Sequence, residues 1–313
     1  MIPFDRQEVK KTAMETLAQA DPKHKTLVLI HTGAMLILTF ALMLIDYLLS
    51  QKISTTGGLG GIGTRTTLTT IQSVLLLAQL AVIPFWQTGY TYLTLQLSKK
   101  EPVGYKSLLE GFLRIGPVFR LLLLQLLLYA GLALIVSNIS STIFLSTPWA
   151  KPFFDMAEAL EQGTQLTNEA LLAASVDVLL PLMLLFFALY LPAYAVVSYI
   201  YRLSMYSLLD DELTGALAAM RNSRILTRGH RLQLFKLDLS FWWFYLLEAL
   251  ISALSFLDMI LPSMGIHLPI PAAAVTFVAF AIYAAAQLAL YYWRKNEVHV
   301  TYAVVYNTLM EEE

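Results

Sequence analysis

Residues 178–200 read VLLPLMLLFFALYLPAYAVVSYI and contain no charged side chain. A helix rises about 1.5 Å per residue and the hydrocarbon core of a bilayer is about 30 Å thick, so roughly 20 such residues cross it. Stretches of the same character recur along the chain. The expected spans are 27–49, 71–97, 118–136, 178–200, 240–261 and 272–293. The sequence therefore predicts an all-α fold, a polytopic membrane helix bundle with about six transmembrane helices joined by short amphipathic helices.

The composition of the whole chain agrees with this class. Hydrophobic residues make up 57% of the chain and charged residues 14%, with a mean hydropathy of +0.62. Soluble domains carry about 25% charged residues, so the composition argues against an ordinary cytosolic enzyme. A net charge of −1 gives no general attraction to nucleic acid. The chain has no cysteine, which removes disulfides, thiolate metal sites and a cysteine nucleophile.

The basic residues are distributed unevenly between the two sides of the predicted bundle. With the N-terminus inside, 18 Lys and Arg residues fall on the inner side, counting Arg120, Arg294 and Lys295 at the inner ends of their spans, and 3 fall on the outer side. Cytoplasmic segments are enriched in Lys and Arg, so we expect both termini in the cytoplasm. The expected parts are an amphipathic N-terminal helix in 1–25, a membrane domain over 26–296 with inner loops 98–117 and 202–239 and outer loops 51–67 and 146–176, and a cytoplasmic tail over 297–313.

Several short motifs carry a resemblance to a known family. Residues 223–231 read SRILTRGHR and residues 234–243 read LFKLDLSFWW, while VKKTA lies at 9–13 and TYAVVY at 301–306. Together these motifs resemble domain-of-unknown-function family 975 of bacterial integral membrane proteins. The residues that carry the motifs are Gly229, Asp238, Ser240, Phe241, Tyr302 and Tyr306. The resemblance implies a bacterial plasma-membrane protein with about six spans, and it implies no activity.

The third inner segment holds the densest cluster of positive charge. Arg221, Arg224, Arg228 and Arg231 are three, four and three residues apart, so on a continuous helix they form one stripe. Such a stripe attracts anionic lipid headgroups at about 1 kcal/mol per residue. The alternative, which we favour, is that the charge only enforces topology. Asp238 is expected to cap the following helix or to pair with a loop arginine.

Glu248 is the most informative ionisable residue within the predicted spans. Glu248 is about eight residues into the fifth span, or about 12 Å along its axis. Ser252 and Ser255 continue a polar stripe from it, and the polar candidates on other spans are Gln79, Gln125 and Gln287. Ionisable groups at this depth usually face a partner or a water-filled cavity. The stripe either forms a proton-linked or polar-solute pathway or fixes helix packing by hydrogen bonds, with packing slightly favoured.

The remaining chemistry-bearing residues form no recognisable site. The five histidines are scattered, and neither an H-E-x-x-H nor a G-x-S-x-G motif is present, so no catalytic residue, metal or cofactor is expected. We expect a non-catalytic membrane scaffold, accessory subunit or envelope protein. The alternative is a small-solute or proton-linked transporter, and a lipid-modifying enzyme ranks well behind both. The expected partners are the lipid bilayer, including anionic lipids, and an unknown membrane protein.

Overall fold

The computed structural model describes residues 4–20, 23–55, 62–162, 168–257, 260–261 and 271–311. Within these ranges the regular structure is entirely helical, so the predicted all-α class is confirmed. The predicted outer loops 51–67 and 146–176 fall partly outside the described residues.

Five helical stretches are long and apolar enough to cross a membrane. Their bounds are His24–Ile53, Thr66–Ser98, Ile115–Leu145, Val176–Asp210 and Ala273–Glu311. The helices α10 (Arg231–Leu239) and α11 (Trp242–Leu254) meet at a bend of 61°. They make a sixth span only if the bent pair is counted as one. Alone, the 13 residues of α11 extend only about 20 Å, which is shorter than a hydrocarbon core. By length and composition, the described part of the chain therefore holds five helices that can span a membrane and one bent helix pair, as expected of a multi-pass membrane protein.

The chain forms two compact units. One unit comprises Met1–Phe119 with Leu203–Glu313, and the other comprises Arg120–Arg202. We call them the large unit and the small unit. The small unit contains α6 (Lys151–Glu161) between most of α5 (Ile115–Leu145) and most of α7 (Asn168–Ile200). Its core is formed by Phe144, Ala150 and Val178.

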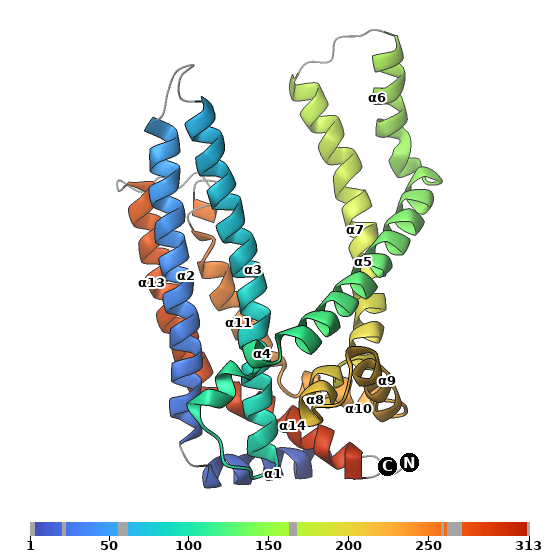
Figure 1. Ribbon diagram of the computed structural model, residues 1–313. Helices are drawn as coiled ribbons and strands as arrows, with labels where there is room; N and C mark the ends of the chain where they lie inside the picture. The colour runs from blue at the N-terminus through green and yellow to red at the C-terminus, as the bar shows by residue number, and fades with distance from the viewer. Residues whose placement is uncertain are drawn as a thin grey trace. The chain divides into compact units, whose positions relative to one another are not determined.

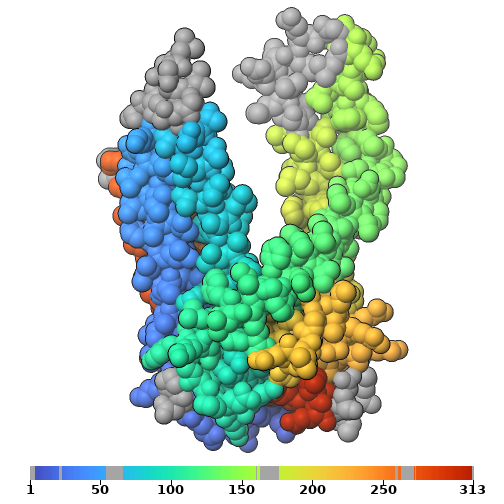
Figure 2. Space-filling view, in the orientation of Figure 1, coloured from blue at the N-terminus to red at the C-terminus, as the bar shows by residue number. Residues whose placement is uncertain are grey.

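In the large unit, four helices lie side by side: α2 (His24–Thr55), α3 (Ile62–Ser98), α11 and α13 (Ala272–Leu290) (Figure 1). The space-filling view shows α2 and α3 packed together over most of their length (Figure 2). Each of these helices has leucine, isoleucine or phenylalanine on much of its surface, and many of these side chains are exposed. Exposed apolar side chains are favourable where the surrounding solvent is lipid.

Short helices gather at one end of the large unit. α1 (Arg6–Gln19) packs against α14 (Asn296–Glu311), and both lie at the same end as α8 (Ser204–Asp210) and α9 (Ala216–Leu226) (Figure 1). A π-helical turn, η4 (Tyr291–Lys295), joins α13 directly to α14. Residues 297–311 of the segment predicted as a tail therefore continue the helix of the last span, and most of α14 is buried.

The loop that follows α3 packs closely against that helix. The loop contains η2 (Tyr105–Leu109) and α4 (Glu110–Leu113). A Cβ atom on Gly89 would lie 1.9 Å from the carbonyl oxygen of Leu108, and one on Gly111 would lie 1.9 Å from that of Phe85. Only glycine allows two backbones to approach so closely, so these two residues set the packing distance.

Candidate functional site

A row of polar side chains, which we call the ladder, lies along the last span. Tyr283, Gln287, Tyr291 and Lys295 recur every four residues and therefore lie on one face of the helix. The ladder extends about 18 Å along the axis. Its inner end coincides with the π-helical turn η4, and such turns occur frequently at functional sites.

Lys295 lies at the inner end of this ladder and is only 3% exposed. Its Nζ is 3.5 Å from Nδ1 of His31 and lies over two rings, 4.7 Å from the centroid of Tyr90 and 4.2 Å from that of Tyr291. No carboxylate among the described residues lies within ion-pair distance of Nζ. The amine is therefore held by an imidazole and by aromatic faces, which attract a cation through their quadrupoles.

His31 connects this amine to α2 and α3. The imidazole is fully buried and lies 4.5 Å from the ring of Tyr90 and 5.6 Å from that of Trp86. The indole N–H of Trp86 donates to the His31 carbonyl at 3.1 Å, and the Tyr90 hydroxyl donates to Oδ1 of Asn296 at 2.5 Å. Nε2 of His31 is buried and has no hydrogen-bond partner in the part of the chain that the structure describes.

Glu248 belongs to the same polar group. The Tyr291 hydroxyl donates to Oε1 of Glu248, and Nε2 of Gln287 donates to the Tyr291 hydroxyl at 3.1 Å. Glu248 also interacts electrostatically with Lys295. The Tyr291 hydroxyl therefore joins the carboxylate of Glu248 on α11 to the amide of Gln287 on α13.

Two other predicted members of the polar stripe, Ser252 and Ser255, follow Glu248 at the end of α11. The Ser255 hydroxyl donates to the Ser252 carbonyl at 2.7 Å, a bond within its own helix. Gln125 lies on α5 in the small unit. Gln79 lines a cavity of about 410 Å³, and Ser255 lines it too.

This cavity lies among α2, α3, the end of α11 and α13. Its polar lining consists of Thr39, Asp46, Gln72, Gln79, Ser255, Thr276 and Tyr283. Tyr283 is also the first residue of the ladder, and it interacts with Gln287 one turn further along. Polar groups therefore follow one another from the cavity along the last span to Lys295.

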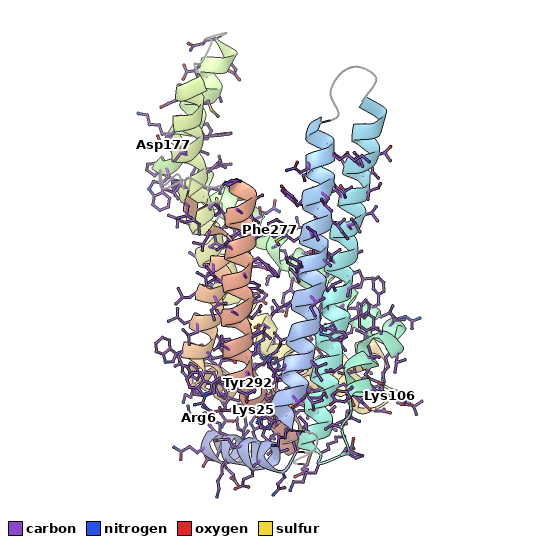
Figure 3. All side chains as sticks on the ribbon, turned by 90° about the vertical axis from the view of Figure 1, so that its left-hand side faces the viewer. Arg6, Lys25, Lys106, Asp177, Phe277 and Tyr292 are labelled. Carbon is purple, nitrogen blue, oxygen red and sulfur yellow. The ribbon has the colours of Figure 1, made fainter. Side chains whose placement is uncertain are left out.

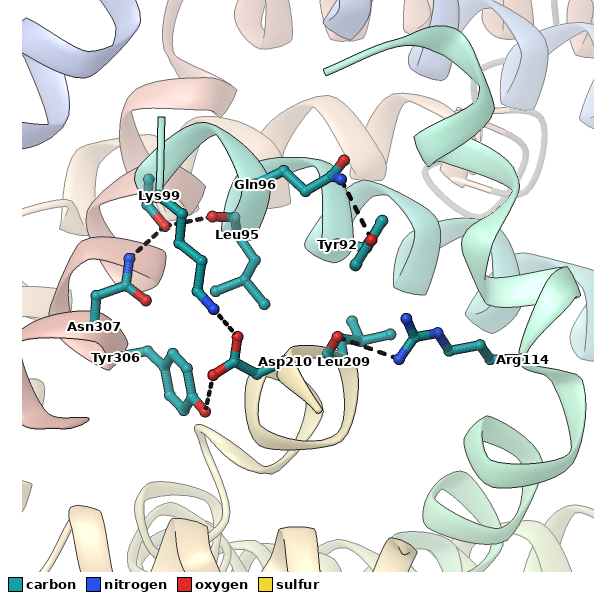
Figure 4. Close-up of polar contacts among 10 residues, drawn as sticks. Tyr92, Leu95, Gln96, Lys99, Arg114, Leu209, Asp210, Tyr306 and Asn307 are labelled. Carbon is teal, nitrogen blue, oxygen red and sulfur yellow. Dashed lines mark hydrogen bonds and ion pairs between the residues drawn. The ribbon is translucent and has the colours of Figure 1, made fainter. Parts of the chain in front are cut away.

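A second polar cluster connects α3, α8 and α14 at the end of the large unit where the short helices gather. Lys99 pairs with Asp210 at the end of α8, and the Tyr306 hydroxyl donates to the same carboxylate at 3.1 Å (Figure 4). Nδ2 of Asn307 donates to Oγ of Ser98 at 2.9 Å. The motif residue Tyr306 thus holds α14 against α8 and the end of α3.

The family-like motifs meet at this inner end. Nζ of Lys10 lies 4.0 Å above the ring of Phe241, while Tyr302 is buried within α14, which packs on α1. Partial burial lowers the pKa of Lys10, and Glu297 opposes that shift. Lys25 lies over the ring of Tyr292 in the same region (Figure 3).

The expectation that Asp238 caps the next helix is wrong. Asp238 lies inside α10, where the Tyr245 hydroxyl donates to it at 3.1 Å, and the N-cap of α11 is Phe241, which makes no side-chain cap bond. Ser240 ends α10, and its hydroxyl donates to the Leu237 carbonyl at 2.5 Å. The carboxylate therefore stabilises the bend between α10 and α11.

The expected single stripe of arginines is also wrong. Arg221 and Arg224 lie on α9, which ends at Leu226, whereas Arg231 begins α10. Gly229 has a φ of 87°, a left-handed conformation that interrupts the helix. Arg221, Arg224 and Arg228 are exposed, and Arg231 is partly buried.

Lys295, His31 and Tyr291 are not among the site residues predicted from the sequence. In the sequence Lys295 is one of the cytoplasmic charges, and His31 is one of five scattered histidines. The four-residue spacing from Tyr283 to Lys295 was the available signal, since it predicts a single polar helix face. No comparable signal pointed to His31.

Comparison with known proteins identifies the family of the chain. No curated protein and no solved structure shows a significant match. One family profile matches residues 1–298, which covers nearly the whole chain and all but the last of the quoted motifs. The chain therefore belongs to the family described as "Protein of unknown function (DUF975)".

Proposed function

We propose that the protein is a non-catalytic membrane carrier that moves protons together with a small polar solute through the large unit. The observation that supports this proposal is the succession of polar groups from the cavity through Gln287 and Tyr291 to Lys295. We assign the carrier to the bacterial plasma membrane with both termini in the cytoplasm, because 18 of the 21 Lys and Arg residues fall on the segments then inside.

The chemistry of the ladder suits proton transfer. A carboxylate, a phenol, an amine and an imidazole follow one another, and each type of group both accepts and releases a proton. Burying such groups in a membrane protein is costly, and they usually mark ion or proton pathways. If the ladder served only to pack helices together, hydrogen bonds between its side chains would be enough. A lysine buried without a carboxylate partner would not be needed.

The test is proton flux into liposomes that contain the full-length protein and the pH-sensitive dye pyranine. After an imposed pH step, liposomes with the wild type should equilibrate faster than protein-free liposomes. Glu248→Gln and Lys295→Met should slow that flux about tenfold or more, which corresponds to about 1.4 kcal/mol in the barrier. Arg224→Gln is the matched control, because Arg224 is exposed on α9, outside the ladder.

Two results would contradict the carrier. One is a wild-type flux equal to that of empty liposomes. The other is an unchanged flux in both ladder variants, each shown by circular dichroism and gel filtration to be folded. In that case the ladder would serve only to pack α11 against α13.

A second candidate function, a scaffold attached to the inner membrane surface, is favoured by a different observation. Leu213 and Leu217 are 94% and 72% exposed, and they precede the exposed Arg221 and Arg224. Basic helices with exposed leucines lie in the interface of anionic membranes.

This candidate is tested by replacing Arg221, Arg224, Arg228 and Arg231 with glutamine. The variant should retain less anionic lipid through purification, measured by mass spectrometry. Salt should reduce the difference from the wild type, because exposed charges are screened over about 8–10 Å. Zwitterionic lipid is the control. Equal retention of anionic lipid would leave the arginines with a topological role only.

A further inference from the structure

We infer that the cavity among α2, α3, α11 and α13 binds a small organic cation, a protonated amine, with Asp46 as its counter-ion. This inference names the solute class of the proposed carrier and therefore rests on that function.

Asp46 is the one charged residue among the described residues that line the cavity. The remaining described lining residues are neutral, and no Lys, Arg or His is among them. Nε2 of Gln72 donates to Oδ1 of Asp46 at 2.5 Å, and Asp46 makes no ion pair with a described residue. Asp46 is exposed and lies three residues before the end of the predicted span, and its carboxylate gives the described lining a negative charge. The cavity therefore attracts cations and disfavours anions.

The neutral groups of the lining suit an ammonium group. Thr39, Gln79 and Thr276 place side-chain oxygens in the lining, and an ammonium group is a donor that needs such acceptors. Phe280 and Tyr283 add aromatic rings, which also attract cations. These groups together recognise a nitrogen that carries several N–H bonds.

The rest of the cavity distinguishes an organic cation from a metal ion. Leu42, Met43, Leu75 and Leu76 form apolar walls that suit a hydrocarbon group. Calcium and magnesium are held by oxygen ligands alone, whereas the described part of this lining combines one carboxylate and several neutral oxygens with these apolar side chains. Its volume of about 410 Å³ lies within the range of about 300–1,000 Å³ found for small-molecule sites.

The experiment uses the full-length protein in lipid nanodiscs and two probes of the same shape. Phenethylammonium carries the positive charge, and 2-phenylethanol replaces the ammonium group with a neutral hydroxyl. A ligand that binds the folded state raises the melting temperature in a saturable manner. Phenethylammonium should raise it, and 2-phenylethanol should not.

Matched variants locate the binding to this cavity. Asp46→Asn should weaken phenethylammonium binding about tenfold or more, whereas Asp177→Asn, an exposed carboxylate in the small unit, should leave it unchanged. If Asp46→Asn fails to fold, Thr276→Val tests the same cavity without a change of charge. It should weaken binding severalfold, since it removes one acceptor.

The outcomes separate this inference from the carrier proposal. Equal effects of the two probes, or wild-type affinity in both cavity variants, would overturn the cation site. Proton flux without phenethylammonium binding would likewise overturn the cation site and leave the carrier intact. Binding without any flux would support the site and contradict the carrier.

Discussion

At the scale of single residues, Lys100 adopts a backbone conformation that favours glycine. Its φ is 57°, and the end of α3 closes with hydrogen bonds from its N–H to Leu97 and from the Glu101 N–H to Gln96, which is the Schellman pattern. The left-handed region costs a residue with a Cβ atom about 1–2 kcal/mol. Lys100 borders a cavity of about 480 Å³ beside the Lys99–Asp210 pair.

We predict that Lys100→Gly stabilises the protein. Relief of the left-handed strain should raise the free energy of unfolding by about 0.5–1 kcal/mol, partly offset by the greater entropy of glycine in the unfolded chain. Thermal unfolding in a mild detergent measures the change. Lys100→Ala is the control, because it removes the amine but keeps the Cβ atom, and it should give no gain. A loss of stability in Lys100→Gly would show that the lysine makes a contact that outweighs its strain.

At the scale of elements, the two inner-loop helices η2 and α4 pack on α3 through Gly89 and Gly111. The atoms that a Cβ would meet there are backbone atoms, which cannot rotate away as a side chain does. The inner loop 98–117 is therefore an integral part of the large unit, held at a distance that two glycines determine.

We predict that Gly89→Ala destabilises the protein by about 1–3 kcal/mol or more, as expected when a packed interface is overfilled. Gly111→Ala should have a similar effect, because its Cβ meets the Phe85 carbonyl at the same distance. Gly33→Ala on α2 is the matched control, since nothing lies within 4 Å of its added carbon. Denaturant titration with helicity as the signal measures all three. A neutral Gly89→Ala would mean that η2 and α4 move freely against α3.

At the scale of the whole molecule, the expected topology puts α1, α9 and α14 on the cytoplasmic side. The chain has no cysteine, so single introduced cysteines report their own accessibility. Ser223 is buried and accepts a hydrogen bond from the Leu203 N–H, which makes it a poor position for a probe. Leu213 and Lys11 are well exposed and are better suited.

We predict that an impermeant maleimide labels Lys52→Cys and Glu161→Cys in intact cells. Leu213→Cys and Lys11→Cys should react only after the membrane is permeabilised, because the positive-inside distribution places them in the cytoplasm. Labelling of Leu213→Cys in intact cells would reverse the assigned orientation.

The sequence by itself determined the class of structure and the positions of the apolar helices. A run such as 178–200 must form a helix in lipid, because every backbone polar group there needs an internal hydrogen bond. This requirement is local, so it is readable without a structure. Glu248 was identified for the same reason, since a carboxylate within a span is costly wherever the helix packs.

Only the tertiary structure decided which polar groups meet. His31 and Lys295 are 264 residues apart, and their contact depends on how α2 packs against the last span. The cavity around Asp46 likewise requires four helices to come together. The break at Gly229, where a left-handed residue separates Arg224 from Arg231, turned an expected stripe into two short helices. Helix pairing is a non-local choice among many apolar faces of similar energy, and the pattern of a single helix does not contain it.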